Sequence, residues 1–116
     1  SGYDPKIFAQ DLLEEFRNAL LVRLTPEQPA RVVDLPDSEI EALGQMTGPL
    51  SSEDLHFLFD MALKAVNDLL RAQDARIVLE MALLRMSQAP RVRALEELLA
   101  AAGGGGPNGS ASPSPK

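Results

Sequence analysis

The chain of 116 residues carries a net charge of −6, contains no cysteine, and is 45% hydrophobic with only 4% aromatic residues. This composition excludes disulfides and thiolate metal sites, and an acidic chain without a basic run is a poor candidate for direct nucleic-acid binding. With so few aromatic residues, the core must be built largely from aliphatic residues such as leucine and alanine, which are strong helix formers. About 100 residues suffice for one core, so we expect a single all-α domain.

The first predicted helix covers residues 5–24. Asp4 is a suitable N-cap and Pro5 suits the first helical position. Apolar residues recur every fourth position and form one stripe, namely Phe8, Leu12, Phe16 and Leu20.

A connector and a short helix are predicted next. Residues 25–36 contain three prolines, which rules out a helix interior, and we expect Val32, Val33 and Leu35 to hold this connector against the core. The spacing Ser38-x-x-Glu41 predicts a capping box that begins a short helix, and Gly48-Pro49 ends it.

The third predicted helix begins at a second box-like sequence, Ser51-x-x-Asp54, and runs to about residue 70. Its apolar stripe breaks at residues 71–76. Without a break the helix would be unusually long for a small domain, so we place a turn there, with Asp74 capping the next helix.

Residues 77–86, within the segment 71–87, are apolar nearly all the way round a helix, interrupted only by Glu80 and Arg85. A helix without a polar face is normally enclosed, and this one is far too short to span a bilayer. The pattern therefore predicts a central buried helix around which the others pack.

The last predicted helix begins at Pro90, which is expected to stop the central helix, and it ends before the glycines of residues 103–106. The Gly/Ser/Pro-rich residues 103–116 are predicted to be a flexible linker. Residues 1–3 are expected to be disordered or left over from expression. The sequence thus predicts one compact bundle of about five helices over residues 4–102.

Catalytic and metal-binding motifs are incomplete. Glu53-x-x-His56 has the spacing of a di-iron ligand pair, but such a site needs a second pair and two further glutamates, and His56 is the only histidine. The glycine run lacks the lysine and hydroxyl residue of a phosphate-binding loop. We expect no catalytic residue, no metal and no cofactor in this chain.

Three charged residues in or directly before the apolar segment are candidates for an interface: Arg76, Glu80 and Arg85. Arg76 lies one turn before Glu80, so a structural ion pair is the plain interpretation, or Glu80 reaches the surface alone. The sharper interpretation is that these charges contact a neighbouring subunit. The nearby Arg91 and Arg93 form either a small basic patch or, with the glutamates that follow, a solvated face of mixed charge.

The order of these elements resembles a known family, domain III of the gamma/tau subunit of the bacterial DNA polymerase III clamp loader. The most specific part is Arg76…Leu79-Glu80…Ala82-Leu83-Leu84, supported by Asp4-Pro5-Lys6-x-Phe8 and Asp11-Leu12-Leu13-x-x-Phe16-Arg17 in the first helix. The chain departs from the family at Asp74-Ala75-Arg76, where the family commonly has Asn-Pro-Arg, and this leaves the helix boundary open.

The resemblance implies a cytoplasmic oligomerisation domain without catalysis. It would join a closed collar that holds the ATPase subunits while the sliding clamp is loaded onto primed DNA, within a nucleotidyltransferase holoenzyme. The implied partners are further gamma/tau copies, delta and delta-prime, with no direct contact to nucleic acid or membrane. From the residues alone, a stand-alone helical adaptor with a groove for a partner helix or peptide remains the alternative.

Overall fold

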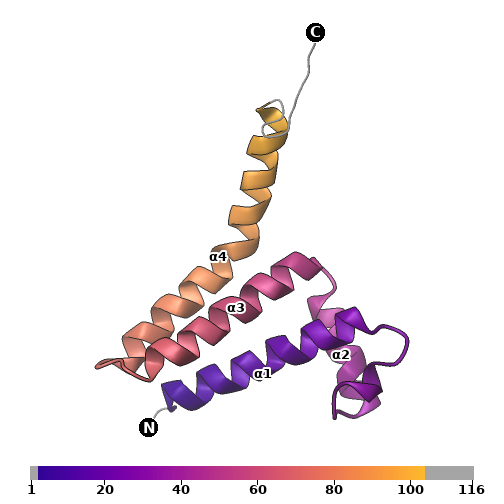
Figure 1. The fold of residues 1–116 in the computed structure, drawn as a ribbon, viewed down its shortest axis with the longest axis horizontal. Helices are drawn as coiled ribbons and strands as arrows, with labels where there is room; N and C mark the ends of the chain where they lie inside the picture. The colour runs from indigo at the N-terminus through magenta and orange to yellow at the C-terminus, as the bar shows by residue number, and fades with distance from the viewer. Residues whose placement is uncertain (1–2, 104–116) are drawn as a thin grey trace.

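A computed structural model of the chain describes residues 3–103; the side chains of residues 89–94 and 96 are not described. Within this range all regular structure is helical, which confirms the all-α prediction. The elements are α1 (Pro5–Leu24), the 3₁₀ turn η1 (Pro29–Arg31), α2 (Asp37–Thr47), α3 (Ser52–Leu69) and α4 (Ala75–Ala102) (Figure 1). The predictions for residues 1–2, for residues 104–116, and for the side chains of Arg91 and Arg93 lie outside the described residues.

Helix α1 has the predicted bounds. At its start the carboxylate of Asp4 accepts a hydrogen bond from the backbone N–H of Lys6 at 2.9 Å, and Pro5 occupies the first turn. At its end the hydroxyl of Thr25 donates to the carbonyl of Leu21 at 2.6 Å. The connector that follows is anchored to the core as predicted, since Val33 is buried.

The predicted capping box at Ser38 is wrong. Helix α2 begins at Asp37, and Pro36 precedes it with an extended backbone and no side-chain cap. The carbonyl of Pro36 accepts the N–H groups of Glu39 and Ile40 at 3.0 Å, so Ser38 already lies inside the first turn. At the other end of α2, the guanidinium of Arg23 donates to the carbonyl of Thr47 at 2.7 Å and ties this helix to α1.

The capping box at the start of α3 is confirmed. The hydroxyl of Ser51 accepts from the N–H of Asp54 at 3.0 Å, and the Asp54 carboxylate accepts from the N–H of Ser51 at 3.3 Å. The predicted turn after α3 is also present. It ends at Asp74, whose carboxylate accepts from the N–H of Ile77 at 3.2 Å and caps α4.

Removing the cap of α4 tests this boundary. The variant Asp74→Ala leaves the N–H of Ile77 without its side-chain acceptor, so we expect the free energy of unfolding to fall by about 0.5–2 kcal/mol. Urea denaturation followed by circular dichroism measures the change. Asp74→Asn keeps an acceptor at the same place and should stay close to wild type; equal losses in both variants would show that the cap contributes little.

Helix α3, and not α4, is the central helix of the bundle. In Figure 1, α3 lies between α1 on one side and α4 on the other, and it makes most of its packing contacts with these two helices. Its buried side chains take part in all three hydrophobic clusters, through Leu58 in the first, Leu55 in the second and Leu69 in the third. The prediction that residues 77–86 form the enclosed helix is therefore wrong, because α4 lies at the edge of the bundle and buries one side only.

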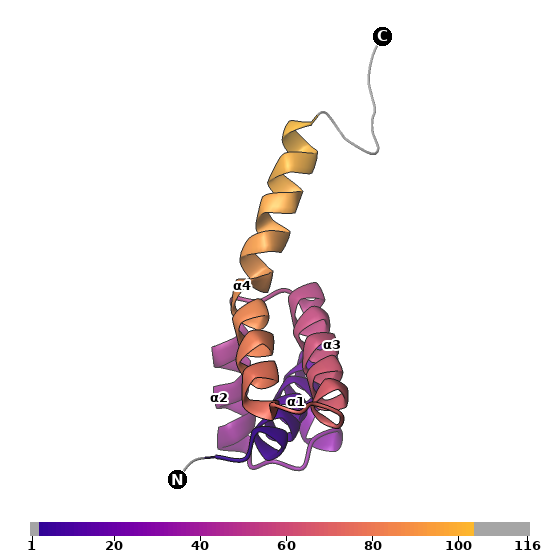
Figure 2. The same ribbon diagram turned by 90° about the vertical axis from the view of Figure 1, so that its left-hand side faces the viewer.

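Helix α4 also does not stop at Pro90. It continues to Ala102 as one helix, where the sequence predicted two, and its second half projects from the bundle (Figure 2). A proline inside a helix removes one backbone hydrogen bond and normally bends the helix without always ending it. Just before it, the hydroxyl of Ser87 donates to the carbonyl of Leu84 at 2.8 Å, an arrangement that also favours bending.

Candidate functional site

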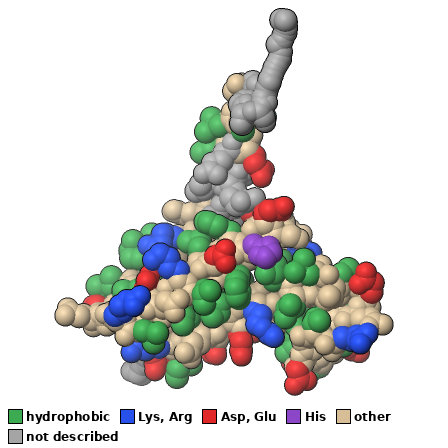
Figure 3. All heavy atoms as spheres, in the orientation of Figure 1, with side chains coloured by type: hydrophobic (Ala, Val, Ile, Leu, Met, Phe, Trp, Pro, Cys, Tyr) green, Lys and Arg blue, Asp and Glu red, His purple; other side chains and the backbone are tan. Residues whose placement is uncertain are grey.

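Metal-ligating side chains do not gather anywhere in the part of the chain that the structure describes. No group of three or more histidine and acidic residues there could hold a metal ion. His56, the second residue of the candidate Glu53-x-x-His56 pair, is exposed, and the single histidine of the chain is visible at the surface in Figure 3. The surfaces with functional potential are instead apolar.

The first such surface is the outer face of α4. Ile77, Met81 and Leu84 are 56%, 47% and 50% exposed, large values for apolar side chains. At about 100° per residue, the spacing i, i+4, i+7 places them together on one side of the helix. The buried side chains of the same helix lie on the opposite side and face α3, namely Leu79, Ala82 and Met86. We call Ile77, Met81 and Leu84 the α4 stripe.

The candidate interface charges flank this stripe on both sides. The guanidinium of Arg76 and the carboxylate of Glu80 form an ion pair at 3.1 Å on one flank, so the plain interpretation of Glu80 is confirmed. Glu80 is 54% exposed, and an ion pair of this kind on a helix surface stabilises the folded state by only about 0.3–0.5 kcal/mol. Helical spacing places Arg85 on the other flank, and the ion pairs found among the described residues do not include it.

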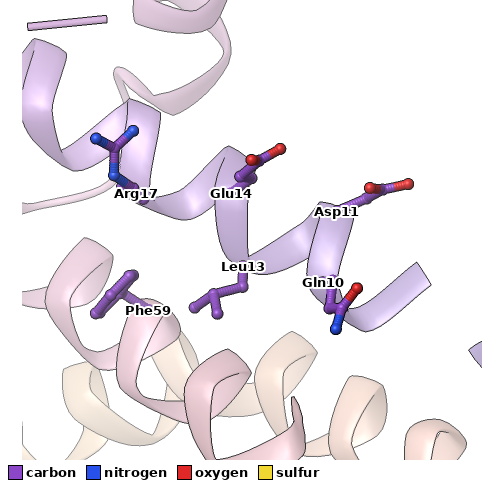
Figure 4. Close-up of a pocket in the computed structure, with 6 residues that line it drawn as sticks. All are labelled: Gln10, Asp11, Leu13, Glu14, Arg17 and Phe59. Atoms are coloured by element: carbon purple, nitrogen blue, oxygen red, sulfur yellow. The ribbon is translucent and has the colours of Figure 1, made fainter. Parts of the chain in front are cut away.

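The second surface is a shallow groove of about 420 Å³ between α1 and α3 (Figure 4). We call it the α1–α3 groove; it is lined by Gln10, Asp11, Leu13, Glu14, Arg17 and Phe59. Leu13 and Phe59 form its apolar floor, whereas Asp11 and Glu14 point away from α3 towards solvent. Arg17 lies on the same rim and donates to the side chain of Asn18 at 3.1 Å.

Neither surface was identified from the sequence. Ile77, Met81 and Leu84 belong to the segment that was predicted to be buried, and the sequence pattern gave Leu13 and Phe59 no role in a surface. The signal that could have shown the α4 stripe was present in the spacing. Residues 79, 82 and 86 form one apolar stripe and residues 77, 81 and 84 form a second one opposite, so α4 has room for two partners, of which α3 is one.

Comparison with known proteins shows which family the chain belongs to. The family model described as DNA polymerase III subunits gamma and tau domain III matches residues 1–101. The DNA polymerase III subunits gamma/tau of Mycobacterium tuberculosis and Mycobacterium bovis are 27% identical to it over 86 residues. That alignment covers 73% of this chain but only 15% of these relatives, so the chain corresponds to a small part of their length. No solved structure matches it significantly.

None of the described helices is long and apolar enough to cross a membrane.

Proposed function

The chain belongs to the family of domain III of the DNA polymerase III subunits gamma and tau, and we propose that it is an oligomerisation domain of a clamp-loader subunit. In this role the domain holds ATPase subunits together in a collar while the sliding clamp is loaded onto primed DNA. Its partners would be further gamma/tau copies, delta and delta-prime, in the cytoplasm.

The observation that carries the proposal is the second apolar side of α4. An exposed apolar stripe on a helix already packed through its opposite face is typical of a surface that binds another protein. Three large side chains at i, i+4 and i+7 are the usual spacing of helix-mediated contacts. The exposed Leu95, Leu98 and Leu99 at the far end of α4 extend this apolar character along the projecting half of the helix.

The proposed role requires no chemistry within this domain. We propose that the domain is not itself an enzyme and takes no cofactor, and that the nucleotide hydrolysis that drives clamp loading belongs to other parts of the subunit. Interaction with neighbouring subunits is then its whole contribution. Arg76, Glu80 and Arg85, which flank the α4 stripe, are the charges proposed to fix the register of this interaction.

Sedimentation velocity over a dilution series tests the proposal. We expect the 116-residue chain to associate in a concentration-dependent manner, and to form a heavier species when mixed with the collar domains of delta and delta-prime. A strict monomer at the highest concentration, which also ignores both partners, would contradict the proposal. It would favour the alternative of a helical adaptor, for which the α1–α3 groove would be the candidate peptide site.

A further inference from the structure

We propose that the α4 stripe of one copy docks into the α1–α3 groove of a second copy. The contact is head-to-tail, because each copy contributes a different surface. This inference rests on the proposed oligomerisation function and assigns its two faces to particular residues.

The two surfaces are separate, and both are open. The groove is lined only by residues of α1 and α3, whereas the stripe lies on the side of α4 that faces away from α3. One copy can therefore use both at once, which a ring requires. A contact between two different surfaces adds subunits in one direction. The chain of subunits closes into a ring if the rotations between neighbouring subunits add up to a full turn.

The apolar part of one surface is a ridge, and the apolar part of the other is the floor of a groove. Ile77, Met81 and Leu84 make a ridge along a helix, and a ridge of this kind normally packs into the groove between two other helices. The floor of the α1–α3 groove is Leu13 and Phe59, which are apolar and only partly buried. Docking would remove both sets of side chains from water.

The charges at the edges of the two surfaces are complementary. Two guanidinium groups and one carboxylate flank the stripe, which gives a net positive charge (Arg76, Arg85 and Glu80). Two carboxylates and one guanidinium lie on the rim of the groove, which gives a net negative charge (Asp11, Glu14 and Arg17). Stripe against stripe would instead bring two net positive surfaces together, so the groove of another copy is the better occupant.

A mixing experiment tests this assignment on the full 116-residue chain. The variant Leu84→Glu damages the stripe and keeps the groove; the double variant Asp11→Arg/Glu14→Arg damages the groove and keeps the stripe. Each alone should associate at least about tenfold more weakly than wild type. Mixed together they retain one intact stripe and one intact groove, so we expect a 1:1 complex of two subunits. Sedimentation velocity detects this complex, and multi-angle light scattering measures its molar mass.

The outcomes separate this inference from the proposed function. If wild type associates but the mixture stays monomeric, the docking mode is wrong and the oligomerisation function stands. If the groove variant alone associates like wild type, the stripe pairs with itself and the inference is again wrong. A wild type that stays monomeric and ignores delta and delta-prime overturns both. Met46→Glu, at an exposed apolar position on α2, should associate like wild type, and thermal melts should show that all variants are folded.

Discussion

Replacing Leu79 by alanine is expected to lower the free energy of unfolding by about 2–5 kcal/mol, a large part of the stability of a small domain. Leu79 is 1% exposed and lies in one cluster with Ala9 of α1 and Leu69 of α3. The smaller side chain leaves a cavity where these three helices meet, and the loss grows with the cavity that remains. Urea denaturation monitored by circular dichroism at low protein concentration measures it.

Leu84→Ala is the matched control, because it makes the same change on the same helix. Leu84 is 50% exposed on the opposite side of α4, so the free energy of unfolding of the monomer should change by only about 0.5 kcal/mol. The same variant should weaken association if the α4 stripe is an interface. Equal losses of monomer stability in both variants would show that α4 is enclosed on both sides, as the sequence alone predicted, and would remove the basis for a docking surface.

Most of the helices could be predicted from the sequence because their ends depend on local interactions. The cap at Asp4, the capping box at Ser51 and the cap at Asp74 each join groups two or three residues apart, and each is present in the structure. The two local errors concern prolines. Pro36 starts α2 through its own carbonyl where Ser38 had been assigned the cap, and Pro90 does not end α4, because a proline inside a helix can be accommodated by a bend.

The place of α4 in the bundle could not be predicted in this way. A helix that is apolar on two opposite sides has the same sequence pattern whether the second side meets its own domain or another subunit. In this chain α3 covers only the side with Leu79 and Met86, and the other side stays exposed. Composition and periodicity identify the two stripes, but they do not say which partner covers each one. The ion pair between Arg76 and Glu80 was predicted and is present, although the segment that contains Glu80 was predicted to be buried and Glu80 is exposed. Their place in an interface stays a prediction.

The two sides of α4 place opposite demands on one helix. In the proposed role, its inner side must be packed closely enough against α3 to hold the helix in place, and its outer side must stay apolar and accessible to a partner. Small side chains meet the first demand. Ala62 and Ala65 of α3 and Ala82 of α4 are nearly fully buried in one cluster, which indicates that the two helix backbones approach closely. Any change that forces α4 outward should therefore affect both stability and association.

Ala62→Leu tests this close approach. Ala62 is 1% exposed and shares a cluster with Ala82 and Met86, so three additional carbon atoms would overpack this site and we expect a loss of about 1–3 kcal/mol in the free energy of unfolding. Because α4 would have to shift away from α3 to make room, association should weaken as well, although no residue of the α4 stripe has changed. Denaturation of the monomer and sedimentation velocity of the same sample measure the two effects.

The control is Ala42→Leu, at an exposed position in α2, where the added side chain extends into solvent. Alanine and leucine differ little in helix propensity, so any difference between the two variants reports packing. We expect Ala42→Leu to remain within about 0.5 kcal/mol of wild type and to associate normally. If Ala62→Leu behaves in the same way, α3 and α4 are not closely packed at this point. If it loses stability but associates like wild type, the outer side of α4 tolerates displacement of the helix, and the position of the stripe does not control assembly.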